Sequence, residues 1–151
     1  IDVVSLSALF STLAAILEDP ISDKLSHAED IYSIGRLMES LDREVLAERL
    51  YASTHLSAAN SAETVLSLLS RSRIYKRKRE YSEAVRLWQQ AFELGSEEAA
   101  LELAKYYEHT AKDYSKALEY TDFLLERITD QKYEANQAHR RQRLLKKKTL
   151  K

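Results

Sequence analysis

Two stretches of the chain repeat one another. They read Tyr75…Glu80-Tyr81-Ser82-Glu83-Ala84…Trp88…Ala91 and Tyr107…Asp113-Tyr114-Ser115-Lys116-Ala117…Thr121…Leu124. The two alanines at the centre of the match, Ala84 and Ala117, lie 33 residues apart. A fainter copy precedes them and carries Gly35, Met38, Ala47 and Tyr51 at matching offsets. Self-similarity at this period indicates a row of stacked helical units, because each unit can bury its apolar face only against a neighbour.

The composition favours an all-α class. The chain has 151 residues, 44% hydrophobic and 31% charged, which is enough for one domain or a short row of repeats. Two glycines and one proline are too few for the many turns of a sheet protein. The sequence contains no cysteine, which excludes a disulfide scaffold, thiolate metal sites and thiol catalysis. The apolar run 3–17 is too short and too rich in serine to span a bilayer, so no membrane contact is expected.

The repeat resembles the tetratricopeptide repeat, a helix-turn-helix unit of about 34 residues. Small residues are needed where its two helices cross closely, and the matching positions are Gly35, Ser72 and Ala104 on the first helix and Ala47, Ala84 and Ala117 on the second. The proline that ends each unit of that family is missing here. The resemblance implies about eight helices, stacked as tetratricopeptide-like repeats into a short right-handed solenoid. The alternative is an ordinary helical bundle with coincidental spacing.

The expected organisation has three parts. A first helix occupies residues 1–19, and residues 20–130 hold three repeats at about 28–61, 65–98 and 97–130. A C-terminal capping helix with a basic tail fills 131–151. Helix starts are expected at polar capping residues, namely Asp42, Ser82, Ser96 and Asp130, and Gly95 is expected to close a helix.

A closer resemblance is carried by Leu103-Ala104-Lys105-Tyr106-Tyr107-Glu108-His109…Lys112-Asp113-Tyr114…Lys116-Ala117-Leu118-Glu119-Tyr120. This stretch is similar to the C-terminal repeat region of bacterial YprB-type proteins, in which an RNase H-like exonuclease domain precedes tetratricopeptide repeats. The opening Asp2-Val3-Val4-Ser5-Leu6 adds to the match. The resemblance implies that Asp2 is the last metal-binding carboxylate of an upstream nuclease, whose remnant is the helix over 1–19. The parent would then be a cytoplasmic exonuclease of nucleic-acid metabolism or DNA repair that uses Mg or Mn.

The chain itself is expected to hold no complete active site, cofactor or metal. Asp2 alone cannot assemble a two-metal site, and a simple role as a helix N-cap is the alternative for it. The four histidines are scattered without metal-ligand spacing, and the two glycines form no phosphate loop.

Binding is therefore the expected function. Superposing the repeats places Arg36, Arg73 and Lys105 at one inward position of a concave face, with Lys76 nearby. An apolar column of Tyr32, Leu69 and Leu101 flanks them. Such a face suits an acidic or phosphorylated protein segment. In the alternative interpretation, nearby carboxylates such as Glu39, Glu102 and Glu108 neutralise the column through local ion pairs.

The basic residues suggest a second hypothesis. Residues 132–151 carry a balance of +7, and the remaining chain carries −8. The candidates for electrostatic contact with DNA are Arg77, Lys78, Arg79, Arg140, Arg141, Arg143, Lys146, Lys147 and Lys148. A solvated helix end is the alternative for the tail. A third interpretation is structural: the array braces the upstream nuclease or mediates a homodimer through the helix over 1–19. The chain could also be a repeat scaffold unrelated to the nucleases.

Overall fold

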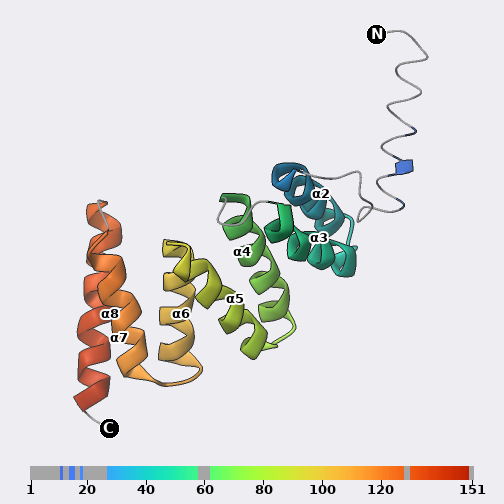
Figure 1. Cartoon of the computed structure of the whole chain (residues 1–151). Helices are drawn as coiled ribbons and strands as arrows, with labels where there is room; N and C mark the ends of the chain where they lie inside the picture. Colours follow the sequence, from blue (N-terminus) through green and yellow to red (C-terminus); the bar gives the residue numbers. More distant parts are fainter. Residues whose placement is uncertain are drawn as a thin grey trace. The chain divides into compact units, whose positions relative to one another are not determined.

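Every regular element that the structure describes is a helix (Figure 1). The computed structural model describes residues 11, 14, 15, 18, 27–57, 62–127 and 130–149. The helices within these residues are α2 (Ala28–Ser40), α3 (Glu44–Ser57), α4 (Ala62–Arg77), α5 (Tyr81–Glu93), α6 (Glu97–His109), α7 (Tyr114–Leu125) and α8 (Gln131–Thr149). The all-α class is confirmed. The helix expected over 1–19 falls largely outside the described residues, and Asp2 lies outside them. None of the described helices is long and apolar enough to cross a bilayer.

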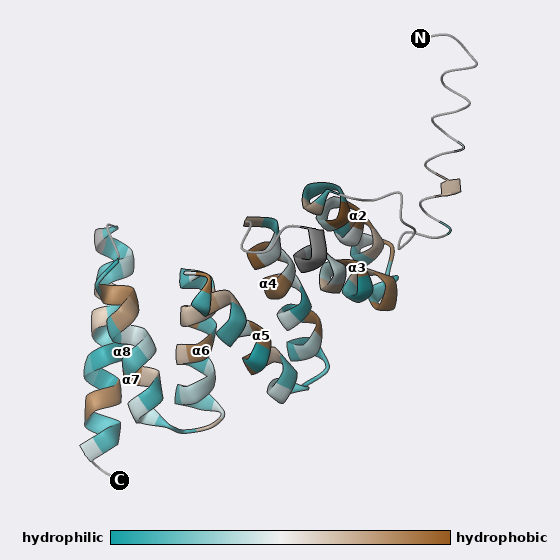
Figure 2. Cartoon of the chain, in the orientation of Figure 1, coloured by the Kyte–Doolittle hydropathy of each residue, from teal (hydrophilic) through white to brown (hydrophobic). Residues whose placement is uncertain are grey.

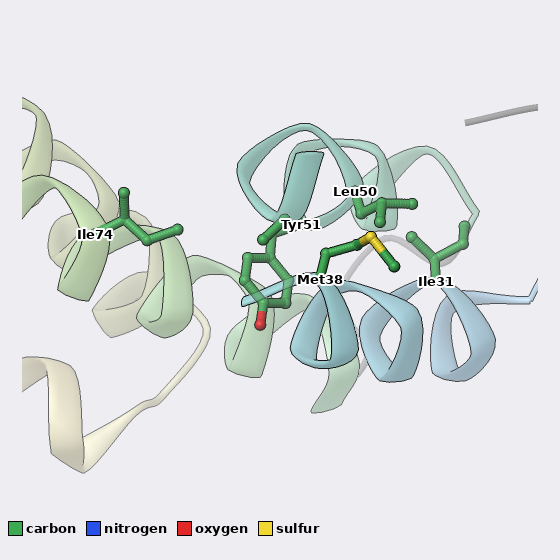
Figure 3. Packing of buried hydrophobic residues seen from close by; sticks show 6 residues of the cluster. Ile31, Met38, Leu50, Tyr51 and Ile74 are labelled. Carbon is green, nitrogen blue, oxygen red and sulfur yellow. The ribbon is translucent and has the colours of Figure 1, made fainter. Parts of the chain in front are cut away.

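The chain divides into two units, Ile1–Ile74 and Tyr75–Lys151. In the first unit, α2 packs against α3. The buried face of α2 is made by Ala28, Ile31, Gly35 and Met38, whose spacing of three and four residues places them on one side of the helix. Figure 3 shows Ile31 and Met38 of α2 directed toward Leu50 of α3. The apolar spacing of the sequence thus becomes the core of this unit.

The crossing of α2 and α3 depends on Gly35. A Cβ atom at Gly35 would lie 2.6 Å from Cε1 and 2.9 Å from Cδ1 of the Tyr51 ring. That ring is 2% exposed, and its hydroxyl donates a hydrogen bond to Glu39 Oε2 at 3.1 Å. Because the ring is buried and held at both ends, it has little freedom to withdraw. The close approach explains the glycine that marks the fainter copy of the repeat.

In the second unit, consecutive helices pack in the order α5–α6, α6–α7 and α7–α8. The core contains Leu87, Leu103, Leu124 and Leu144, all at 0% exposure. Figure 2 shows that the surface of α8 is largely hydrophilic, so its attachment to the unit needs more than apolar burial. The six small positions of the repeat, three in each of the two helix types, are buried across the two units: Gly35, Ala47, Ser72, Ala84, Ala104 and Ala117.

The helix starts follow local capping rules in part. Ser96 accepts a hydrogen bond from the Ala99 N–H, and Asp130 accepts one from the Tyr133 N–H, so these two expectations are confirmed. Gly95 closes α5 as expected, with a φ of +87° that suits glycine. The prediction that Ser82 starts a helix is wrong. The helix begins at Tyr81, and the carbonyl of Glu80 already accepts a hydrogen bond from the Ala84 N–H.

The prediction that Asp42 caps the next helix is wrong as well. It lies in the turn between α2 and α3 with a φ of 57°, in the left-handed region, and α3 begins two residues later at Glu44. The carbonyl of Arg43 accepts the bond from the Ala47 N–H that starts the helix. Asp113, which was not expected, caps α7 by accepting from the Lys116 N–H. Asp and Asn serve turns as well as caps, so a sequence alone does not separate the two roles.

Substituting Gly35→Ala tests the crossing. In an unobstructed helix, replacing glycine by alanine stabilises by about 0.5–1 kcal/mol. Here the new methyl group meets the Tyr51 ring, so we expect a loss of about 1–3 kcal/mol in the free energy of unfolding. Urea denaturation followed by circular dichroism measures it. Ser33→Ala, at an exposed position of the same helix, is the matched control and should cost nothing. A Gly35→Ala variant as stable as this control would contradict the close contact.

Candidate binding site

A recess of about 170 Å³ opens in the second unit between the end of α4, the start of α5 and α6. The α6 helix supplies Glu102, Tyr106 and His109, whose spacing of four and three residues directs them to one face. The complete lining is Lys76, Tyr81, Trp88, Glu102, Lys105, Tyr106, His109 and Thr110. Cationic, anionic and aromatic groups therefore meet in one small volume.

Two lysines of the recess share one carboxylate. Glu102 accepts a hydrogen bond from Lys76 Nζ at 2.5 Å and another from Lys105 Nζ at 2.6 Å. Burial raises the pKa of Glu102, but the bonds from Lys105 and Lys76 outweigh burial and hold that pKa below its ordinary value. Glu102 is therefore ionised at neutral pH and balances only one of the two ammonium groups. The lysine side chains are 46% and 41% exposed, so the excess positive charge faces solvent.

Aromatic rings form the apolar wall of the recess. The Tyr106 ring lies 5.9 Å from the Tyr81 ring and 6.4 Å from the Trp88 ring, measured between centroids. The Nζ atom of Lys76 lies 5.8 Å from the centroid of Trp88, within cation–π range. Trp88 is the single tryptophan of the chain and is 2% exposed. Its fluorescence is thus a reporter of events in the recess.

A second ionic cluster lies where α6 meets α8. The side chain of Glu108 is fully buried, and Arg143 binds it with both Nε and Nη2 at 2.8 Å. Lys147 Nζ donates to Oε1 at 3.0 Å, and Arg140 Nε lies 3.5 Å from Oε2. Burial raises the pKa of Glu108, but hydrogen bonds from Arg143 and Lys147 outweigh burial and lower that pKa to about 2. This cluster joins α8 to α6.

The predicted concave column is distributed over both units. Arg36 and Arg73 are exposed in the first unit, where Leu69 is buried and the Tyr32 ring lies 5.7 Å from that of Tyr51. Lys105 and the half-buried Leu101 belong to α6 in the second unit. Of the predicted binding residues, the recess brings together Lys76 and Lys105. Trp88, Tyr106 and His109 were missed. The spacing of four residues between Lys105 and His109 on one helix was a usable signal for His109, whereas no local rule connects Trp88 to these lysines.

Four of the six predicted cations of the basic tail are bound to carboxylates. Arg140, Arg143 and Lys147 surround Glu108, and Arg141 Nε donates to Asp122 Oδ1 at 2.6 Å. Lys146 and Lys148 are exposed, and Lys148 lines a second recess beside the α6–α7 turn. Arg77, Lys78 and Arg79 are exposed where α4 ends. The nucleic-acid candidates thus include residues that hold the fold together.

No group of His, Cys, Asp and Glu in the described part of the chain could hold a metal ion. Comparison with protein-family models finds no matching family, and comparison with curated proteins finds no match either. The resemblances to tetratricopeptide repeats and to YprB-type nucleases consequently stay predictions. The chemistry that the described site offers is ionic and apolar contact.

The Glu108 cluster predicts a pH dependence of stability. The pKa of this carboxyl falls from 4.5 to about 2 on folding, so the unfolded chain takes up the proton first as pH is lowered. The contribution of Glu108 is complete above pH 4.5 and is lost as pH falls toward 2, and it amounts to about 3 kcal/mol. Urea denaturation at a series of pH values measures it.

Glu108→Gln should remove this pH-dependent part of the stability and cost about 3–5 kcal/mol at neutral pH, because it leaves the largely buried Arg140 and the partly exposed Arg143 and Lys147 without their carboxylate. Glu119→Gln, at an exposed position of α7, changes the same charge and should retain the slope of the parent. If the free energy of unfolding depends on pH with the same slope in the parent, Glu108→Gln and Glu119→Gln proteins, Glu108 is not the titrating group.

Proposed function

We propose that the chain is a helical-repeat interaction domain whose recess binds an acidic segment of a partner protein. The observation that carries this proposal is the pair of lysines, Lys76 and Lys105, that share Glu102 beside aromatic rings. One carboxylate leaves one ammonium charge unbalanced at a half-exposed position. A carboxylate or phosphate of the partner completes that balance, and the rings receive the apolar part of the same segment.

The tetratricopeptide-like architecture is supported by burial. All six positions at which that repeat places small residues are buried. The two helices of a repeat contact one another in two of the proposed repeats, α2 with α3 in one and α6 with α7 in the other. We propose on this basis that the helix pairs are tetratricopeptide-like repeats of a short right-handed solenoid. The lining of the recess combines Lys76 of α4 and residues of α6, which are first helices of their repeats, with Tyr81 and Trp88 of α5. Arrays of this kind bind partners on such concave surfaces.

The affinity of one such contact is modest. An exposed ion pair contributes about 0.2–1 kcal/mol and is weakened by salt. The aromatic wall adds apolar contact that salt does not screen. We therefore expect a transient complex whose affinity is built from several acidic groups in one segment.

The place of this domain in a larger protein is proposed from the YprB-type resemblance alone. We propose that it accompanies a cytoplasmic RNase H-like exonuclease that uses Mg or Mn, with Asp2 as the last metal-binding carboxylate. In the protein as its gene encodes it, Asp2→Asn should abolish Mg- or Mn-dependent hydrolysis of end-labelled DNA and RNA. Unchanged hydrolysis, or none in the parent protein, would remove this part of the proposal and leave the interaction domain.

The recess is tested with a fluorescein-labelled peptide of about eight glutamates. At low salt the peptide should bind, measured by anisotropy and by Trp88 fluorescence. Lys76→Gln and Lys105→Gln should each weaken it about two- to fivefold, the change expected from one exposed ion pair. The double variant should weaken it further, because Glu102 then repels the peptide.

Lys132→Gln is the matched control, since it removes the same charge at an exposed position of α8 outside the recess. Equal affinities for this control and the double variant would contradict the proposal. An oligothymidylate that binds more tightly than the peptide and loses affinity with Lys146→Gln or Lys148→Gln would favour the nucleic-acid hypothesis instead.

A further inference from the structure

Glu108 is surrounded by more positive charge than it can balance. Arg140, Arg143 and Lys147 all contact its single carboxylate. A carboxylate has about four lone-pair sites, and Arg143 and Lys147 use three of them. The buried Nε of Arg140 has no hydrogen-bond partner. The bidentate bond from Arg143 already neutralises the carboxylate, so neutralisation does not account for the other two cations.

The excess charge is directed outward. The Glu108 side chain is at 0% exposure, whereas Arg143 and Lys147 are 39% and 36% exposed. Burial lowers the pKa of Arg140, the Glu108 carboxylate raises that pKa, and the neighbouring charge of Arg143 lowers it again, so Arg140 and Arg143 repel one another beside the carboxylate they share. An anion placed over these side chains would relieve that repulsion without displacing Glu108.

The cluster adjoins the recess. His109 lines the recess, and its Nε2 lies 3.5 Å from Oε2 of Glu108. Arg140 is attracted by Glu102 of the recess as well as by Glu108. All of these residues belong to the second unit. The recess cations of α4 and α6 and the cations of α8 are therefore neighbours within the second unit, linked through Glu102, Glu108 and His109 of α6.

We propose that the exposed cations of the α6–α8 cluster, Arg143 and Lys147, form a second anion subsite on the binding face. The face then takes an extended protein segment with two separated acidic groups, one in the recess and one over α8. This inference rests on the proposed function and adds the spacing and number of acidic groups in the partner.

An acidic protein segment fits this face better than a nucleic-acid strand. Strand binding without sequence preference uses open aromatic faces on which bases stack. Here Trp88 is 2% exposed, and the half-buried rings of Tyr81 and Tyr106 pack against one another with 5.9 Å between their centroids. Glu102 and Glu108 also interrupt the cations, whereas a phosphate backbone presents a continuous run of charge. A peptide can place its acidic groups at the two cationic positions and neutral residues between them.

Lys147 is the residue through which the subsite is tested. Its removal leaves the bidentate Arg143–Glu108 pair intact, so the attachment of α8 is retained. Lys146 is exposed and does not contact Glu108, and it provides a control of equal charge on the same turn of α8. Lys147→Arg keeps the charge and should keep binding. Thermal unfolding of each variant verifies that the fold is unchanged.

Two labelled peptides of equal length serve as probes, one with glutamates at both ends and serines between, the other with glutamates at one end. For the two-ended peptide, Lys105→Gln and Lys147→Gln should each weaken binding about two- to fivefold. The double variant should weaken binding by the product of the two single fold-changes. For the one-ended peptide each single loss should be below about twofold, because the other subsite still accepts it.

The outcomes separate the two proposals. If Lys105→Gln weakens peptide binding but Lys147→Gln weakens it no more than the Lys146→Gln control does, the second subsite is overturned and the recess remains a binding site. If neither Lys105→Gln nor Lys147→Gln weakens binding, both proposals are overturned. A two-ended peptide that binds no more tightly than the one-ended peptide would likewise overturn the second subsite. So would an oligothymidylate that displaces the peptide and is weakened equally by Lys146→Gln and Lys147→Gln.

Discussion

The buried carboxylate of Glu108 is the constraint on which the second unit depends. An ionised carboxylate can be removed from water only when hydrogen bonds and opposite charge replace its hydration. Arg143 and Lys147 supply that replacement, and both lie on α8. The hydrophilic α8 has few apolar side chains with which to attach itself, although Leu144 is fully buried. Its place beside α6 is therefore set by charge as much as by apolar packing, and removal of Glu108 would leave Arg140, Arg143 and Lys147 without the carboxylate they share.

The α6 helix carries both carboxylates around which these cations gather. Glu102 holds two lysines over the aromatic recess, and Glu108 holds the cations of α8. In each place the cations outnumber the carboxylate, so the ion pairs that stabilise the fold leave positive charge at the surface. Under the proposed function, stability and binding use the same side chains. A chain with a formal net charge of −1 thus has an excess of cations at both places.

The helical class, the small positions and the pairing of Lys76 and Lys105 with Glu102 could be predicted from the sequence, whereas the partners of Glu108 could not. The spacing of Ala84 and Ala117 predicts two buried positions, and both are at 0% exposure. The partners of Glu108 lie 35 and 39 residues later in the chain, in a run that has the composition of a solvated tail. No local rule connects such distant residues. Lys105 donates to Glu102 three residues earlier on the same helix, in agreement with the alternative in which nearby carboxylates neutralise the column.

Residue-resolved NMR distinguishes one acidic-segment face across α6 and α8, as proposed, from two separate sites. The ¹⁵N-labelled chain would be titrated with the two-ended acidic peptide at low salt. We expect chemical-shift changes concentrated at Lys105 and His109 of α6 and at Arg143 and Lys147 of α8, with the same dependence on peptide concentration at all four. Shifts confined to the first unit, or midpoints that differ between α6 and α8, would contradict the single face.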